Sequence, residues 1–150
     1  MASTPADLVW EIVRSQNSYL VKRKSGGGVQ FSRDPLNLTN LHSRKYAGFV
    51  NDKAIGVVPN EKGGVKVISK KAADVQKPAK CTTSTTFHGG KTSRSTYKAI
   101  ANQTAKNGYR PDLRAAAVSR ASAIRQSQRE KKPEPEKKVR GKKAAAAESS

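Results

Sequence analysis

Apolar side chains are concentrated in the first seventy residues, where short apolar groups alternate with glycine, proline and polar turns. The opening group of Leu8, Trp10, Ile12 and Val13 follows Pro5 and has the spacing of a short amphipathic helix. We interpret Trp10 as a core anchor, because tryptophan is highly buried on average. The pattern therefore predicts a short N-terminal helix.

Short β-branched and aromatic groups follow this helix and predict strands. The first two, at 19–21 and 29–31, flank a run of three glycines that suits a hairpin loop. A second hairpin is expected between 49–50 and 54–58, and residues 65–69 add a final strand. Together these segments predict a small antiparallel sheet with the first helix packed on one face.

The pattern changes after residue 70. Residues 71–90 are mostly polar and predict a connector. Residues 91–130 return to helical spacing, with one helix ending near Asn107 and a second beginning at Pro111, a preferred first helical residue. The apolar stripe of the second helix is narrow and consists of Leu113, Ala117, Ala121, Ile124 and Gln128.

Charge adds a class of binding partner to this picture: the chain carries 30 Lys and Arg against 11 Asp and Glu, a net charge of +19. Self-repulsion at that charge destabilises a compact state unless a polyanion relieves it, and nucleic acid is the usual polyanion. An anionic membrane surface would instead require helices with large apolar residues, where these helices present mostly alanine. The composition therefore indicates nucleic acid and no membrane.

Basic residues gather in the helical segment, where Asp112 is the only acid between residues 91 and 129. A solvated helix face normally mixes signs, so a uniform sign favours phosphate contact, which the planar fork of arginine suits. Another basic pair precedes Tyr46, which we interpret as a core residue rather than a base-stacking one. The candidate RNA-binding residues are Lys22, Arg23, Lys24, Arg44, Lys45, Lys70, Lys71, Arg94, Arg110, Arg114, Arg120, Arg125 and Arg129.

Two arginines of the second helix carry the most specific expectation. Arg114 and Arg125 lie beside the apolar stripe, roughly 16 Å apart along the axis at 1.5 Å per residue. We expect the pair to clamp one RNA segment. Because they lie beside the stripe rather than within it, we also expect their replacement to leave the helix intact.

No pattern of catalysis or cofactor binding is present in the sequence. Cys81 is the only cysteine, and with His42 and His88 it makes no four-ligand metal set. Phosphate-binding glycine motifs and nucleophile triads are absent, and the acids are scattered singly. The N-terminus shows no signal-peptide pattern. We expect no enzyme, no cofactor, no metal and no small-molecule substrate.

Residues 131–150 mix Lys, Ala, Pro and Glu and lack the apolar side chains needed to fold alone. We expect a disordered or RNA-threading tail that the rest of the chain does not need for folding. The sequence thus predicts an α+β fold in four segments: helix and sheet at 1–70, connector at 71–90, basic helices at 91–130, and tail at 131–150.

Several motifs, taken in order, resemble the eukaryotic large-subunit ribosomal protein family numbered twenty-eight. The resemblance covers roughly residues 5–128, and the shared order makes it specific where each motif alone is modest. The motifs are Trp10 with Val13-Arg14, Ser18-Tyr19-Leu20-Val21-Lys22-Arg23, Asn37-Leu38-Thr39-Asn40, Tyr46-Ala47-Gly48, Gly56-Val57, Tyr109-Arg110-Pro111-Asp112-Leu113, Ala116-Ala117 and Arg120-Ala121-Ser122-Ala123-Ile124.

This resemblance implies a structural protein bound to ribosomal RNA on the large subunit of the cytoplasmic ribosome. It also implies neighbouring ribosomal proteins as partners and assembly in the nucleolus. A ribosome-assembly factor and a chromatin-type DNA-binding protein are the alternatives. The basic tail argues against the first, because the nucleolar assembly factor with a similar N-terminal domain is longer and carries an acidic extension. The sheet-first order and the second helix argue against the second.

Overall fold

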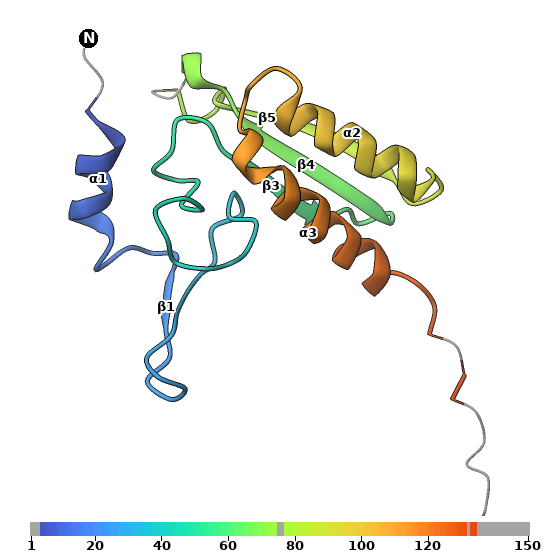
Figure 1. Ribbon diagram of the computed structural model, residues 1–150, viewed down its shortest axis with the longest axis horizontal. Coiled ribbons are helices and arrows are strands. Elements are labelled where there is room, and N and C mark those ends of the chain that lie inside the picture. The colour runs from blue at the N-terminus through green and yellow to red at the C-terminus, as the bar shows by residue number, and fades with distance from the viewer. Residues whose placement is uncertain (1–3, 75–76, 132, 135–150) are drawn as a thin grey trace, which may run out of the picture.

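A computed structural model of the chain describes residues 4–74, 77–131 and 133–134. Its α+β architecture confirms the predicted fold class (Figure 1). Short 3-10 turns occur at Ala72–Asp74 and Pro111–Leu113. The helices and strands, in chain order, are α1 (Ala6–Val13), β1 (Leu20–Lys22), β2 (Gln30–Ser32), β3 (Ile55–Pro59), β4 (Gly64–Lys70), β5 (Thr82–His88), α2 (Ser93–Ala105) and α3 (Arg114–Ser127).

The strands form two antiparallel sheets where the sequence predicted one. β1 and β2 pair around the glycine loop as expected, and β3, β4 and β5 form a three-stranded sheet in that order. The expected hairpin between residues 49–50 and β3 is wrong, because β3 pairs with β4. Side chains hold the backbone of this segment in turns instead: Asp34 accepts from the Phe49 N–H at 3.0 Å, and the Asn51 amide donates to Ala47 O at 2.9 Å.

The third strand of the larger sheet, β5, lies inside the segment that polarity assigned to a connector. Threonine is β-branched and fits a pleated strand, which explains why a polar run extends the sheet. Of the β5 side chains only Phe87 is buried, and it lies opposite Val65 of β4. Because β5 is an edge strand with one buried side chain, it lacks the alternation of apolar residues by which strands are predicted.

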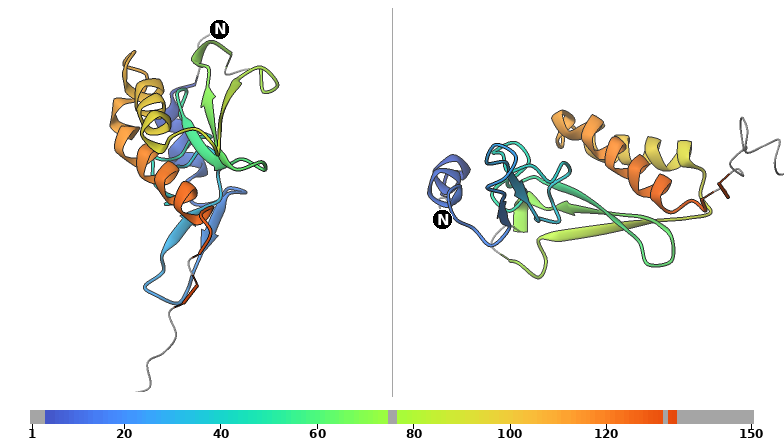
Figure 2. Two further views of the ribbon diagram at one scale, coloured as in Figure 1. Left: turned by 90° about the vertical axis from the view of Figure 1, so that its right-hand side faces the viewer. Right: turned by 90° about the horizontal axis from the view of Figure 1, so that it is seen from below.

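Helices α2 and α3 pack against each other and cover one face of the three-stranded sheet (Figures 1 and 2). The predicted stripe faces inward over most of its length, since Leu113, in the turn before α3, is 3% exposed and Ala117 and Ala121 are fully buried, whereas Gln128 at its end is exposed. Ile124 packs at the margin of the same cluster. The core consists of Leu38, Ile55, Val57, Val65, Val67, Phe87, Ile100, Leu113, Ala117 and Ala121.

Helix α1 packs against the loop that precedes β3, so the expectation that it covers a sheet face is wrong. Trp10 is buried as predicted, in a second cluster with Ala47 and Val50. An ion pair of 2.8 Å between Arg44 and Asp7 ties the same loop to the helix. The inner face of the larger sheet is already occupied by α2 and α3, which leaves the loop as the apolar partner of α1.

A close backbone approach fixes the loop before β3. A Cβ at Gly56 would lie 2.1 Å from Pro35 O, and a Cβ at Gly48 would lie 2.3 Å from the Leu36 Cβ. Glycine at these two positions therefore lets residues 35–36 pack directly onto β3 and the preceding turn.

Most of the predicted tail lies outside the described residues, which include only Lys131, Pro133 and Glu134 of it. The division of the chain into four segments stays a prediction. The main hydrophobic core, however, joins Leu38 of the first segment to Ala121 of the third. None of the helices in residues 4–74 and 77–131 has the length and apolar character needed to cross a bilayer.

Candidate nucleic-acid interface

The thirteen predicted RNA-binding cations fall into two groups by their contacts. One group donates hydrogen bonds to carbonyl oxygens or amides elsewhere in the fold and is at least partly buried; its members are Arg44, Lys70, Arg110, Arg120 and Arg125. The other group is exposed, although Lys22 also donates to Ser15 O at 3.1 Å; its members are Lys22, Arg23, Lys24, Lys45, Lys71, Arg94, Arg114 and Arg129.

Arg110 joins three parts of the chain at the start of α3. Its Nη1 donates to Lys53 O at 2.8 Å, and its Nη2 donates to Lys45 O at 3.1 Å. Both Nε and Nη2 also donate to the Asp112 carboxylate at 2.8 Å. This hydrogen-bonded pair raises the pKa of Arg110 and lowers the pKa of Asp112. Only 17% of the Arg110 side chain is exposed, so it acts mainly as an internal tie.

Tyr109, beside it, holds the end of the larger sheet. Its hydroxyl accepts from the Ala54 N–H at 3.1 Å and lies within donating distance of the Lys70 and Ala54 carbonyls. Burial raises the pKa of this hydroxyl, which keeps it protonated, so that its one proton can be donated to either carbonyl. The Tyr109-Arg110-Pro111-Asp112-Leu113 motif is thus a structural junction.

Arg120 fastens the middle of α3 to β3. Its Nε donates to Val57 O at 2.7 Å, while Nη1 donates at 3.0 Å to both Leu38 O and the Asn40 side chain. Desolvation by burial lowers the pKa of its guanidinium. The oxygen atoms that accept these hydrogen bonds stabilise the partly buried guanidinium. Because none of them belongs to a carboxylate, the positive charge of Arg120 is not neutralised by them.

Arg125 fastens the end of α3 to the loop between β5 and α2. Its Nη1 donates to Gly89 O at 2.8 Å and to His88 O at 3.3 Å, and its Nη2 donates to Lys91 O at 2.9 Å. Arg114, its expected partner in an RNA clamp, is exposed at the other end of the helix. The two arginines therefore stand in different environments, and a shared phosphate-binding role stays a prediction.

Lys70 and Arg44 support the loop before β3. The Lys70 Nζ donates to Asn51 O at 2.9 Å and to Phe49 O at 3.4 Å. Arg44 donates to the Asn51 side chain and to Asp7. These two cations cross-link residues 44–51 to β4 and to α1.

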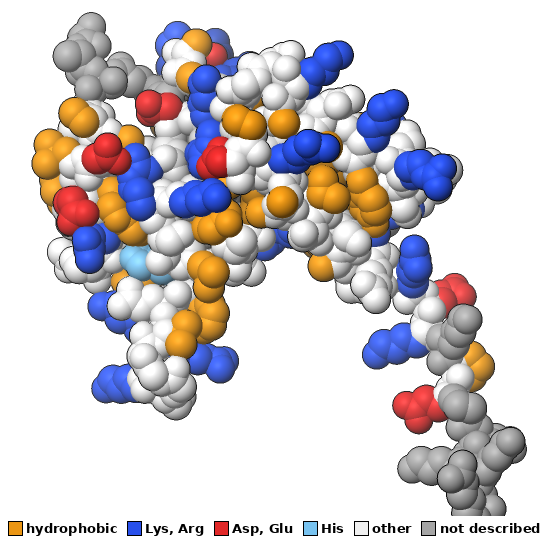
Figure 3. Space-filling view, in the orientation of Figure 1, with side chains coloured by type: hydrophobic (Ala, Val, Ile, Leu, Met, Phe, Trp, Pro, Cys, Tyr) orange, Lys and Arg blue, Asp and Glu red, His pale blue; other side chains and the backbone are white. Residues whose placement is uncertain are grey.

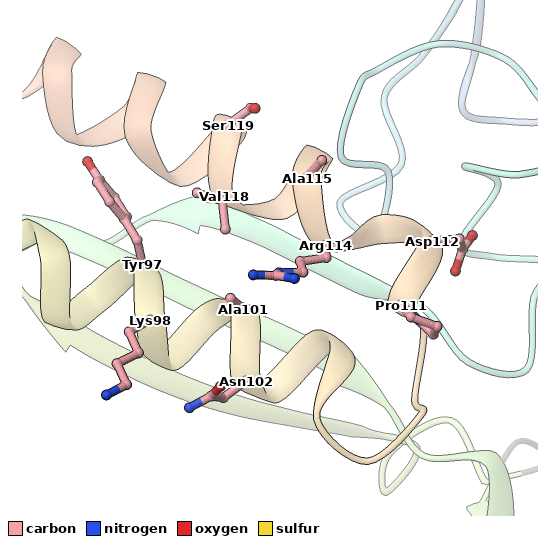
Figure 4. A pocket seen from close by; sticks show the side chains of 10 residues that line it. All are labelled: Tyr97, Lys98, Ala101, Asn102, Pro111, Asp112, Arg114, Ala115, Val118 and Ser119. Atoms are coloured by element: carbon pink, nitrogen blue, oxygen red, sulfur yellow. The ribbon is translucent and has the colours of Figure 1, made fainter.

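Arg114 reaches an open groove between α2 and α3 (Figure 4). The groove encloses about 800 Å³, and Tyr97 and Val118 point into it from the two helices. Lys98 and Asn102 stand at its α2 rim. A smaller hollow beside it is lined by Arg114 and by Lys106.

Two cations beside this groove, Lys98 and Lys106, are not among the predicted RNA-binding residues, although their spacing is visible in the sequence. Lys98, Asn102 and Lys106 are spaced by four residues, so they share one side of α2. Packing of α3 beside α2 then brings Arg114 next to that row. Asp112, the one carboxylate lining the groove, is already paired with Arg110.

The exposed cations of the hairpin form a second basic region. Lys22, Arg23 and Lys24 adjoin the glycine loop, at the protruding end of the molecule, and basic side chains also stand out along the helical side (Figure 3). Tyr46 packs against the main core, in agreement with our interpretation of it. In the ranges that the structure describes, no group of three potential metal ligands gathers.

Comparison with known proteins shows similarity along most of the chain. The model of the family described as the Ribosomal L28e protein family matches residues 8–127. The large ribosomal subunit protein eL28 of Schizosaccharomyces pombe is 44% identical over 131 residues, which cover 87% of this chain and 97% of that protein.

Proteins of the same name from other organisms are also similar to this chain. Large ribosomal subunit protein eL28 of Dictyostelium discoideum is 38% identical over 84% of this chain and 90% of its own length. The protein of that name from Caenorhabditis elegans is 32% identical over 81% of this chain and 88% of its own length.

Proposed function

The chain belongs to the Ribosomal L28e protein family, and we propose that it is a structural constituent of the large subunit of the eukaryotic cytoplasmic ribosome, bound to ribosomal RNA by phosphate neutralisation. In that role it supports translation without catalysis. Family membership confirms the expectation that the chain is not an enzyme, because members are structural components. Neighbouring ribosomal proteins are further partners, and assembly takes place in the nucleolus.

One observation carries the RNA-binding part of this proposal: exposed cations from two helices line an open groove and the smaller hollow beside it. Lys98 of α2 and Arg114 at the start of α3 line the groove, and Arg114 and Lys106, which follows the last residue of α2, line the smaller hollow. Like charges gathered on one side of a molecule repel each other unless an anion compensates them. A phosphate backbone supplies a row of such anions, and the groove leaves room for it.

The fate of the carboxylates supports the same partner. In the described part of the chain, Asp7, Glu11, Asp74 and Asp112 each form an ion pair with a nearby cation. Asp34 is buried and accepts backbone hydrogen bonds. Most of the 30 basic residues therefore lack an internal acid, and an external polyanion must supply the compensating charge. Membership in a ribosomal family favours RNA over the DNA of chromatin as that polyanion.

Sedimentation of the full-length chain from a eukaryotic cell extract tests this function. We expect a tagged chain to sediment with large subunits and complete ribosomes, and to leave isolated large subunits as the salt concentration rises. Recovery of the chain with chromatin, or at the top of the gradient, would contradict the proposal. A tag on the same chain denatured before mixing controls for nonspecific sticking of a basic polypeptide.

A further inference from the structure

The hairpin of β1 and β2 presents an exposed apolar face. Val29 is 40% exposed, Phe31 is 37% exposed and Leu41 is 44% exposed. Val21 lies opposite Phe31 in the pairing of β1 with β2, and Leu41 bridges Phe31 from the other side. Directly opposed residues in an antiparallel pair point to the same face. Phe31 therefore lies between Val21 and Leu41 on one apolar face of the hairpin, and Figure 3 shows apolar side chains along one edge of the hairpin.

A hollow of about 530 Å³ opens on this face. Val21 and Phe31 give it an apolar wall, and Arg23 and Arg33 add two guanidinium groups. Thr39 and Asn40 contribute polar atoms to its lining. The volume lies in the range of about 300–1,000 Å³ that is usual for sites of small ligands.

The rim of this hollow is held in place by the fold. The Arg33 N–H donates to Tyr19 O at 2.9 Å, and the Ser32 N–H donates to Asn40 O at 2.7 Å. The Asn40 side chain in turn accepts from Arg120 of α3 at 3.0 Å. The hollow is thus anchored to the main core, and a ligand would meet a preorganised surface.

The charge of the hollow selects among possible occupants. Its lining, all within the described residues, contains two arginines and no carboxylate. An apolar peptide laid on Phe31 would have to desolvate both guanidinium groups without pairing them. A nucleotide offers an aromatic face for Phe31 and phosphates for the arginines, which is how proteins hold unstacked bases of single-stranded RNA.

We propose that this hollow seats one unpaired nucleotide of ribosomal RNA, with its base stacked on Phe31 and its flanking phosphates at Arg23 and Arg33. The inference rests on the proposed function and adds to it a residue that recognises a base. Phosphate neutralisation alone needs no aromatic side chain. Replacement of Phe31 should therefore weaken RNA binding only if a base stacks on its ring.

Three variants at position 31 separate stacking from apolar packing in the full-length chain. Phe31→Tyr keeps the ring, Phe31→Leu keeps the apolar volume, and Phe31→Ala removes both. The probe is an RNA hairpin with an unpaired loop, compared with a blunt RNA duplex of equal length. We expect Phe31→Tyr to bind the loop like the parent, and Phe31→Leu and Phe31→Ala to bind it at least about fivefold more weakly. Binding to the duplex should be the same for all four chains.

Base-specific methylation of RNA in large subunits containing each variant locates the nucleotide. We expect one unpaired base to be protected by the parent and by Phe31→Tyr, and to become reactive with Phe31→Leu. Equal protection by all variants would overturn the inference and leave the proposed function standing. Normal assembly of Phe31→Leu, together with a photo-crosslink from position 31 to a protein, would assign the face to a peptide and also overturn it. Failure of the parent chain to bind any RNA would refute the proposed function, and the inference with it.

Discussion

The side-chain amide of Gln128 pairs with the backbone of Gly64 as a neighbouring strand would. Its Oε1 accepts from the Gly64 N–H at 2.8 Å, and its Nε2 donates to Gly64 O at 2.9 Å. Gly64 is buried, with a φ of 88°, and a Cβ there would lie 2.1 Å from Phe87 O. The end of α3 is thereby fixed to the first residue of β4.

We therefore expect replacement of Gln128 to lower the free energy of unfolding, although Gln128 is exposed and not part of the hydrophobic core. We expect Gln128→Ala to cost about 1–3 kcal/mol, because a buried backbone donor loses its partner. Gln128→Glu should cost at least as much, because a carboxylate oxygen would face Gly64 O. Thermal unfolding followed by circular dichroism measures both. Gln126→Ala, at an exposed position of the same turn, is the control and should unfold like the parent.

Arg120 and Arg94 provide a second contrast, between a structural and an exposed arginine. Arg120→Ala leaves the carbonyls of Val57 and Leu38 without their charged donor. We expect a loss of about 1.5–3 kcal/mol in the free energy of unfolding. Arg94→Ala should change it by no more than about 0.5 kcal/mol, because Arg94 is exposed. Urea titration of both variants checks this, and equal midpoints would contradict the assigned roles.

Periodicity predicted the elements whose apolar residues repeat. The stripe from Leu113 to Ala121 is buried as expected, and the hairpin of β1 and β2 forms around its glycines. The same reasoning missed β5, because an edge strand of threonines buries only Phe87. It also assigned residues 49–50 before β3 to a strand. The turn there depends on the hydrogen bond that Asp34 accepts from the Phe49 N–H and on the one that Asn51 donates to Ala47 O, and neither is visible in the alternation of apolar residues.

Charge patterning was less informative about individual arginines than about the whole chain. In a helical projection, Arg120 and Arg125 cannot be distinguished from exposed arginines that bind phosphate. In the structure, however, carbonyls of distant loops accept their hydrogen bonds. Such acceptors are backbone atoms, which leave no mark in the sequence. The groove is different, since the four-residue spacing of Lys98, Asn102 and Lys106 is visible in the sequence. What the sequence does not show is that α3 places Arg114 beside them.

Asp112 makes stability depend on pH in the acid range. The hydrogen bond from Arg110 lowers its pKa below the ordinary value of 3.8, so the unfolded chain takes up a proton at higher pH than the folded chain. The stabilisation is present above about pH 4 and is lost as the pH falls through the lowered pKa. Because 40% of the side chain is exposed, its size should stay under about 1 kcal/mol.

Melting temperatures of Asp112→Asn and of the parent between about pH 2 and pH 7 test this dependence. The variant should be less stable near neutrality, and the difference should vanish toward pH 2. Glu61→Gln, in the turn between β3 and β4, controls for the removal of an exposed carboxylate. A difference that persists unchanged at the lowest pH would show that the Asn side chain perturbs the fold by another route.

The groove between α2 and α3 gives the most direct test of RNA binding, and the structure decides which residues to change. Reversing Arg125 would detach the loop after β5, so a variant of Arg114 and Arg125 together would mix folding with binding. Lys98→Glu with Arg114→Glu changes two exposed side chains at the groove. The matched control is Lys62→Glu with Lys80→Glu, which makes the same change of net charge at exposed positions away from the groove.

We expect both double variants to keep the circular dichroism spectrum of the parent, and only the groove variant to be lost from large subunits. Two phosphate contacts become two repulsions in that variant, so its binding to single-stranded RNA should also depend less on salt. The log–log slope should fall in magnitude by about 0.7 for each contact removed. Equal losses in the two variants would mean that net charge alone drives binding. If the groove variant instead enters large subunits as well as the parent does, the groove is not an RNA-binding site, and the exposed cations of the hairpin are the next candidates to change.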